Sequence, residues 1–413
     1  MGSLVGIVVV VIGILASVAL HEVGHMLPAK KFGVLVPDYA VGFGPALWKK
    51  KIGETTYALR AILLGGYVKI VGMYAPARPG TRLVGRGGKL TLAQEAREAS
   101  AEEIPEGQEH RAFYHLSAPK KVTVMLGGPI MNLLICFVLS AIAMMGIGAP
   151  TASRTIAEVP ATITSASGEV ASPAYEAGVR PGDTVVAWNG APVSTFADLQ
   201  RAVGATPDGE SAVLTVERDG GTVDLTVTPV TGAQGVHIVG VTAGYEYVSA
   251  SLSDVAAANW QMFKGTASVV VRLPQAVWQV GRSIVTDEKR DASGVVSVVG
   301  VGRMAGEVTG DSQALGLQDT RQVVAVLLSL LASLNMALFV FNLIPLPPLD
   351  GGHILGALYE GARRTFARAR GAQDPGPADT ARLVPLTWAV GGVLVVMSVI
   401  LIVADIVKPV SLG

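Results

Sequence analysis

The sequence predicts a polytopic α-helical membrane protein with four transmembrane helices, a β-sheet near the membrane and a compact α/β domain. Half of the 413 residues are hydrophobic and only 15% are charged, which is typical of integral membrane proteins with some water-exposed mass. Four stretches lack Asp, Glu, Lys, Arg and His over roughly the 20 residues that a helix needs to cross a bilayer. They cover residues 4–20, 122–153, 323–349 and 383–404.

These stretches place the transmembrane helices at residues 1–28, 118–150, 322–352 and 383–407. A secretory signal peptide is the alternative for the first stretch. That stretch has no basic region before it and no small-residue cleavage site after it, and both are expected of a signal peptide. We therefore expect the first stretch to form a transmembrane helix.

The positions of Lys and Arg predict the orientation in the membrane, because short loops rich in these residues stay in the cytoplasm. The loop between the first two helices contains 15 of them, and the short loop between the last two contains five. The segment between the second and third helices contains eleven, with few near its borders. We therefore expect the first and third loops in the cytoplasm, and both termini and the middle segment outside.

The first apolar stretch leads directly into His21-Glu22-Val23-Gly24-His25. On a helix, His21 and His25 lie one turn apart on the same face and can bind one metal ion. Glu22 is placed to take a proton from water that the metal holds. Such groups at the end of an apolar span are costly and usually functional. The alternative is a solvated helix end just outside the membrane.

Asp350 is the candidate for a third ligand, since a catalytic zinc ion usually has three protein ligands and one position for water. It lies in Asn342–Gly352, where three prolines interrupt the third apolar stretch. The first and third helices run in the same direction, so Asp350 reaches the same side as His21 and His25. The alternative is that Asp350 caps a helix beginning at His353. We expect His353 itself to pack or cap, because a fourth ligand would fill the water position.

Two asparagines are candidates for contact with a substrate. Asn342 is an amide at an otherwise apolar helix end, able to hold a peptide backbone or a developing oxyanion. The alternative for Asn342 is a hydrogen bond between helices. Asn132 follows Gly127-Gly128-Pro129, where glycines allow close helix approach. Asn132 either joins helices or faces the site, and the sequence leaves both readings open.

Residues 33–74 are expected to form a β-sheet at the cytoplasmic membrane boundary. Tyr39–Trp48, Thr55–Leu64 and Tyr67–Val71 have the pattern of strands, and much of this region is too apolar for free exposure to water. A small soluble meander is the alternative. Residues 75–117, rich in Pro, Gly, Arg and Glu without a period, are expected to form a flexible cytoplasmic linker.

Residues 155–232 are expected to form a compact α/β domain. A Pro181-Gly182-Asp183 turn leads into a strand at Thr184–Trp188, and a helix at Thr195–Val203 precedes two alternating strands at Ala212–Arg218 and Thr222–Thr228. This pattern resembles a bacterial-type PDZ domain. Such domains bind peptides by adding a strand beside a helix; the alternative is a domain that only blocks access. Residues 251–321 are expected to form an amphipathic extracytoplasmic segment.

The remaining composition excludes other kinds of site. Cys136 is the single cysteine and lies in an apolar stretch, so we expect it to pack and not to form an internal disulfide. The formal net charge of zero gives no indication of a nucleic-acid partner. The sequence leaves the oligomeric state open.

The order of the motifs resembles the bacterial site-2 protease family, over nearly the whole chain. The motifs that carry the resemblance are HEVGH at residues 21–25, Gly42-Phe43-Gly44, Gly65-Gly66-Tyr67-Val68, Gly128-Pro129 with Asn132, one PDZ-like unit and NLIPLPPLDGG at residues 342–352. The resemblance implies one Zn²⁺ ion held by His21, His25 and Asp350. It also implies Glu22 as the base and Asn342 as a substrate-binding residue. The single PDZ-like unit and the insert at 78–109 depart from the pattern of some relatives.

The resemblance implies a zinc-dependent intramembrane endopeptidase of the bacterial cell membrane. Such proteases typically cut single-span proteins of the lipid bilayer, such as anti-sigma factors, after another protease has trimmed the outer portion. One alternative is a membrane-anchored PDZ peptide-binding protein with a structural or inactive metal site, against which the intact Glu22 argues. The other is a metal transporter, against which the lack of an inverted repeat of ligand motifs argues.

Overall fold

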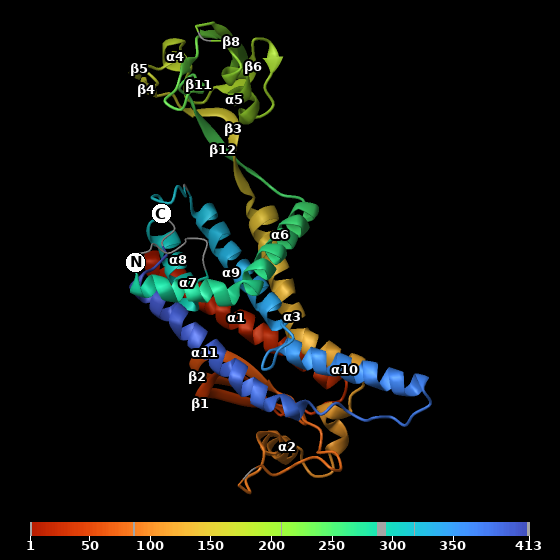
Figure 1. Ribbon diagram of the computed structural model, residues 1–413. Helices are drawn as coiled ribbons and strands as arrows, with labels where there is room; N and C mark the ends of the chain where they lie inside the picture. Colours follow the sequence, from red (N-terminus) through yellow and green to blue (C-terminus); the bar gives the residue numbers. More distant parts are fainter. Residues whose placement is uncertain (1, 86, 208, 287–294, 318, 411–413) are drawn as a thin grey trace. The chain divides into compact units, whose positions relative to one another are not determined.

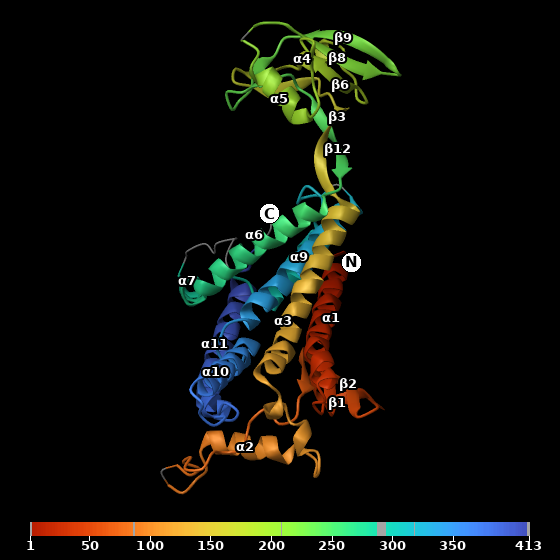
Figure 2. The same ribbon diagram turned by 90° about the vertical axis from the view of Figure 1, so that its right-hand side faces the viewer.

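A computed structural model of the chain describes residues 2–85, 87–207, 209–286, 295–317 and 319–410. The chain forms two compact units. Unit 1 consists of Met1–Gly146 and Ser251–Gly413, and unit 2 consists of Ile147–Ala250. Their helices and strands are labelled in Figure 1 and Figure 2.

Unit 1 is built on long apolar helices. Among the described residues, four helices are long and apolar enough to cross a membrane, which confirms the predicted number. Their outward side chains, such as Leu4 and Val395, are 66% and 63% exposed, as contact with lipid requires. The helices are α1 (Gly2–Lys31), α3 (Ala118–Ala141, continued by a π-helix over Ile142–Ile147), α9 (Thr320–Asn342) and α11 (Val384–Val407).

Helix α3 packs against both α1 and α9 (Figures 1 and 2). The approach to α1 is close because Gly24 and Gly127 face each other, and a Cβ on either would collide with the backbone of the other. The buried Asn335 of α9 donates a hydrogen bond to Ser17 of α1 over 2.9 Å. Small residues and buried polar contacts of this kind fix how apolar helices meet.

The third predicted span, residues 322–352, is divided in the structure. Helix α9 ends at Asn342, and α10 (Asp350–Ala369) starts eight residues further along the chain. Proline has no N–H for the helical ladder, so the three prolines between the two helices account for the break. As a result, Asp350 is the first residue of a new helix and not the end of the old one.

The predicted sheet of residues 33–74 is a long hairpin of β1 (Asp38–Ile52) and β2 (Thr55–Lys69). The strands pair antiparallel from Ile52↔Thr55 to Asp38↔Lys69, and residues 38–41 also pair with residues 56–59. The expected break at Gly65-Gly66 is wrong, because β2 continues through both glycines. Gly65 has a positive φ of 121°, and glycine adopts such a backbone conformation without strain.

Residues 75–117 were predicted to form a flexible linker, but they contain a helix, α2 (Leu92–Glu102). The prediction is therefore wrong for this part of the segment. Thr91 caps the helix by accepting a hydrogen bond from Gln94 N–H. The buried Arg97 binds Asp379 with 2.6 Å between Nη2 and Oδ1. Composition alone missed this helix, because its docking partner lies far away in the sequence.

Unit 2 contains a twisted antiparallel sheet in the order β12-β3-β6-β8-β9 with one helix, α5, packed beside it. Two strands have the predicted bounds, β6 (Thr184–Trp188) and β8 (Ala212–Arg218), and Trp188 and Leu214 lie in the core. The unit extends beyond the predicted 155–232, because β12 pairs with β3. The other bounds are β3 (Ala149–Glu158), α5 (Phe196–Gly204), β9 (Gly221–Val227), β10 (Val230–Thr231), β11 (His237–Ile238) and β12 (Thr242–Val248).

The segment predicted as amphipathic, residues 251–321, contains three helices in its described part. They are α6 (Leu252–Val271), α7 (Leu273–Val285) and α8 (Val298–Gly310), and α8 packs along α1. Residues 287–294 and 318 of this segment lie outside the described residues.

Candidate metal centre

Three possible ligand atoms converge between α1 and the start of α10. The Nε2 atoms of His21 and His25 lie 3.2 Å apart, and Asp350 Oδ2 lies 3.4 Å from the first and 3.3 Å from the second. Ligand atoms on a tetrahedral ion with bonds of about 2.0–2.1 Å are themselves about 3.3 Å apart. The triangle therefore has the size of one face of a tetrahedral zinc site.

The environment of the triangle also fits a bound cation. Asp350 Oδ2 is buried and has no hydrogen bond of acceptable geometry among the described residues. Burial acts to raise the pKa of the Asp350 carboxyl, but the two imidazoles beside it outweigh burial and hold that pKa well below its usual range. A Cβ on Gly128 would collide with the ring nitrogens of His21 and His25. Two imidazoles and an ionised carboxylate form a donor set that zinc accepts.

Helix α3 orients the two histidines. Val124 O accepts a hydrogen bond from His25 Nδ1 over 2.8 Å, and Asn132 Nδ2 lies 3.0 Å from His21 Nδ1. Val124, Gly128 and Asn132 are spaced four residues apart, so they share one face of α3. Contacts to the Nδ1 atoms leave both Nε2 atoms directed at Asp350, as outer contacts of metal-binding histidines usually do.

A buried ion pair attaches the helix that carries Asp350 to the same α3. Lys121 Nζ donates to Glu360 Oε2 over 2.7 Å, and the two side chains are 6% and 2% exposed. Glu360 Oε2 also accepts from Ala378 N–H over 2.9 Å. A charge buried this deeply is stable only while its partners are in place. The pair therefore fixes α10, and with it Asp350, relative to the histidines.

Glu22 lies half-buried at the junction of α1 and the hairpin. The backbone of Val68 in β2 lies near its carboxylate, and a Cβ on Gly66 would come within 3.4 Å of Glu22 Cγ. Glu22 also lies close enough to His21, His25 and Asp350 to affect them electrostatically. The sheet thus positions a carboxylate beside the triangle without making it a member of the triangle.

Comparison with known proteins identifies the family. The family model for Peptidase family M50 matches residues 9–373. The chain belongs to this family. It is 32% identical to the zinc metalloprotease Rip1 of Mycobacterium tuberculosis, with 98% of each chain covered, and 30% identical to Rip1 of Mycolicibacterium smegmatis, with 99% of this chain and 98% of the relative covered. It is 26% identical to the metalloprotease MmpA of Caulobacter vibrioides over 89% of each chain.

These matches confirm three predictions made from the sequence: the site-2 protease family, a protease activity and a zinc cofactor. They do not assign roles to individual residues. The geometry brings His21, His25 and Asp350 together, while His353 is not among the residues whose ligand atoms converge in the described part of the chain. Burial lowers the pKa of His353, so its ring is neutral near pH 7.

The two candidate substrate-binding asparagines occupy different environments. Asn342 is the half-buried last residue of α9, and it precedes the proline-rich turn that leads to Asp350. Asn132 is fully buried, and its amide contacts His21. Sequence reasoning missed that contact and the Val124 carbonyl, although the pair Gly127-Gly128 did indicate that another helix approaches α3 closely.

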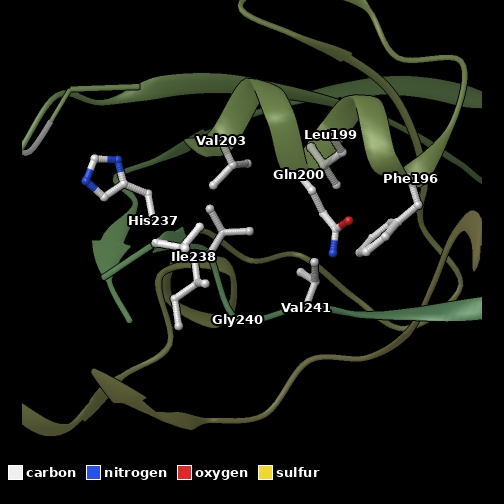
Figure 3. A pocket seen from close by; sticks show the side chains of 10 residues that line it. Phe196, Leu199, Gln200, Val203, His237, Ile238, Gly240 and Val241 are labelled. Carbon is white, nitrogen blue, oxygen red and sulfur yellow. The ribbon is translucent and has the colours of Figure 1, made fainter. Parts of the chain in front are cut away.

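Unit 2 contains a second candidate site, a groove of about 350 Å³ between α5 and the segment Val236–Val241. Figure 3 shows Phe196 and Gln200 pointing from α5 toward Val241 on the opposite wall. The lining is mainly apolar, and its second wall lies beyond the predicted boundary of the PDZ-like domain at residue 232. A groove between a helix and an extended segment is the arrangement in which PDZ domains take a peptide.

Proposed function

We propose that the chain is an intramembrane endopeptidase whose single zinc ion is held by His21, His25 and Asp350. The observation that carries the proposal is the triangle of ligand atoms with sides of 3.2–3.4 Å, at the end of an apolar helix. Zinc bound there would act as a Lewis acid and lower the pKa of a water molecule toward about 7.

Glu22 is the general base of the proposed reaction. It takes a proton from water as the peptide carbonyl is attacked, and it then returns that proton to the leaving nitrogen. The carboxylate lies next to Gly66 and Val68 of β2, and it is not one of the converging ligand groups. A group with this duty must remain free of the metal, and the separate position of Glu22 satisfies that requirement.

The substrate must be locally unwound, because a helical peptide carbonyl is already hydrogen-bonded. We propose that the β1–β2 hairpin holds the unwound segment by strand addition. Asn342 is proposed to contact the same segment from the end of α9. Side chains such as Leu47 and Trp48, which are 68% and 52% exposed, suit a hairpin that enters the membrane boundary.

We propose that the substrates are single-span membrane proteins, such as anti-sigma factors, that another protease has already shortened. The charge count supports a zinc site toward the cytoplasm and an extracytoplasmic PDZ-like unit 2 with both termini on its side. In this orientation unit 2 acts on the outer portion of the substrate and not on the scissile bond. It either binds that portion in the groove or excludes portions that are too large.

Replacing Glu22 tests the proposed chemistry directly. Glu22→Gln keeps the shape of the side chain and removes the base, so cleavage of a co-expressed single-span substrate should fall by about 10²–10⁴-fold. Zinc content of the purified protein should stay unchanged, because Glu22 does not bind the ion. The matched control is Glu106→Gln, which alters an exposed carboxylate and should leave both quantities unchanged. Substantial turnover by Glu22→Gln would refute the assignment of the base.

A further inference from the structure

The side-chain amide of Asn132 has one satisfied and one unsatisfied end. Asn132 is 0% exposed, and its Nδ2 lies 3.0 Å from His21 Nδ1. Its Oδ1 is buried with no hydrogen-bond partner among the described residues. A buried polar atom without a partner costs about 1–3 kcal/mol, so only one end of this amide can be paired at His21.

The state of His21 decides which end of the amide can face it. A neutral imidazole carries a single N–H. When Nε2 binds a metal ion, that hydrogen must be on Nδ1, which then donates and needs an acceptor. The Nδ2 group of Asn132 is also a donor and cannot fill that role. Half a turn of the amide exchanges Nδ2 and Oδ1 without changing the shape of the side chain.

We propose that Asn132 is a positioning residue for the metal site: in the zinc-bound protein its Oδ1 accepts a hydrogen bond from His21 Nδ1–H. This inference rests on the proposed role of His21 as a ligand. The turn replaces a contact between two donors by a hydrogen bond to Oδ1, and this bond holds the His21 ring with Nε2 toward Asp350. It also explains why an amide lies in the interior of an apolar helix, where a polar group needs a reason.

The second histidine supports the same reading. His25 donates its Nδ1–H to Val124 O, a group that can only accept. Val124 and Asn132 lie two turns apart on one face of α3, with Gly128 between them leaving room for the rings. One helix therefore supplies an acceptor to each histidine, from its backbone in one case and from a side chain in the other.

The test compares two substitutions at Asn132 in full-length protein purified in detergent. Asn132→Asp keeps an acceptor and removes the donor, whereas Asn132→Leu removes both. We expect zinc affinity, measured by competition with a chelator, to fall about 10–100-fold for Asn132→Leu and to be kept or raised for Asn132→Asp. The visible absorption of the cobalt-substituted protein should change for Asn132→Leu and resemble that of the unchanged protein for Asn132→Asp.

Asn335→Leu is the matched control. Asn335 is also 0% exposed, and it bonds to Ser17 instead of a candidate ligand. The Asn335→Leu variant should have lower thermal stability than the unchanged protein but the same zinc affinity.

The comparison at Asn132 can overturn the proposal. Equal losses of zinc affinity for Asn132→Leu and Asn132→Asp would mean that Asn132 donates. If Asn132→Leu does not fold, the zinc affinity of Asn132→Asp still decides between donor and acceptor. A different result would refute the proposed ligand set: the protein without substitutions and the Asp350→Ala variant would contain equal amounts of zinc.

Discussion

The triangle of His21, His25 and Asp350 in unit 1 and the groove beside α5 in unit 2 differ in what lines them. In the triangle, three donor atoms lie 3.2–3.4 Å apart and α3 restrains the two rings from behind. In the groove, mainly apolar side chains face an extended segment. Converging donors select a small cation, whereas an apolar cleft beside extended backbone selects a stretch of peptide. This contrast supports the proposal that unit 1 carries the chemistry and unit 2 the selection of substrates.

Both units also bury an ion pair, and the pairs differ in what they support. Lys121 and Glu360 join α3 to the helix that begins with Asp350. Asp183 and Arg218 join β8 to the turn before β6, within unit 2. The first pair therefore bears on the metal site and the second only on the stability of its own unit. Five changes can break or sharpen this contrast.

The largest effect is expected from removing the third ligand. Asp350→Ala should lose zinc and reduce cleavage by more than about 1,000-fold, because two protein ligands hold the ion poorly. Zinc content in detergent and cleavage of a single-span substrate measure the two effects. The fold of unit 2 should not change. If the variant keeps full zinc occupancy, Asp350 serves only as the first residue of α10 and the ligand must be sought elsewhere.

The next effect is expected from Glu360→Gln, which leaves the charge of Lys121 buried without its partner. Removing one member of such a pair costs about 3–5 kcal/mol, so the thermal unfolding midpoint in detergent should fall. Zinc affinity should fall as well, because α10 is no longer tied to α3. Adding Lys121→Met should recover part of the stability.

An exposed pair provides the control for this change. Glu54 binds Arg111 over 2.9 Å, and their side chains are 39% and 25% exposed. Pairs of this kind contribute about 0–1 kcal/mol, so Glu54→Gln should lower the midpoint much less and leave zinc affinity unchanged. Equal effects of Glu360→Gln and Glu54→Gln would show that the buried pair does not position the site.

The sequence predicted the triangle because its chemistry is local and its topology is simple. A motif one helical turn long contains His21, Glu22 and His25, and the direction of two spans brings Asp350 to the same side. Asn132 was harder to assign, since its contact depends on the rotation of α3 about its axis, which apolar patterning does not fix. Helix α2 was missed because its buried Arg97 pairs with Asp379, which lies 282 residues away in the sequence. The boundary of unit 2 was missed because β12 belongs to it through pairing with β3.

Removing unit 2 tests whether it selects substrates. Replacing Ile147–Ala250 by a short linker should permit cleavage of an untrimmed substrate, while zinc content and cleavage of the trimmed form persist. The comparison uses full-length and pre-trimmed substrate with both enzymes. If the shortened enzyme still cuts only trimmed substrate, selection lies elsewhere. If it cuts neither despite normal zinc, unit 2 supports the fold or recruits the substrate.

A substitution in the groove separates peptide binding from mere exclusion. Gln200 is exposed and points into the groove (Figure 3), so Gln200→Trp should fill it with little loss of stability. If unit 2 binds the peptide in the groove, kcat/KM for trimmed substrate should fall about tenfold. This fall corresponds to the loss of about 1.4 kcal/mol, roughly the contribution of one buried contact. Gln200→Ala is the matched control and should change little. An unchanged kcat/KM for Gln200→Trp would favour a domain that only excludes.

The last change concerns the pH dependence of the stability of unit 2. Burial acts to raise the pKa of Asp183, but hydrogen bonds from Arg218 and from the backbone N–H of Arg180 outweigh it, so the pKa lies below its usual value. A carboxylate with a depressed folded pKa stabilises the fold above its unfolded pKa of about 3.9 and loses that contribution as pH falls through the folded value. Asp183→Asn should therefore lower the free energy of unfolding by about 1.5–3 kcal/mol at pH 7. The difference in this free energy between the two proteins should shrink as the solution is acidified below about pH 4. Urea unfolding of the segment Ile147–Ala250, followed by Trp188 fluorescence, measures both. A difference that stays constant down to pH 2 would mean that Asp183 contributes through its shape and not through its charge.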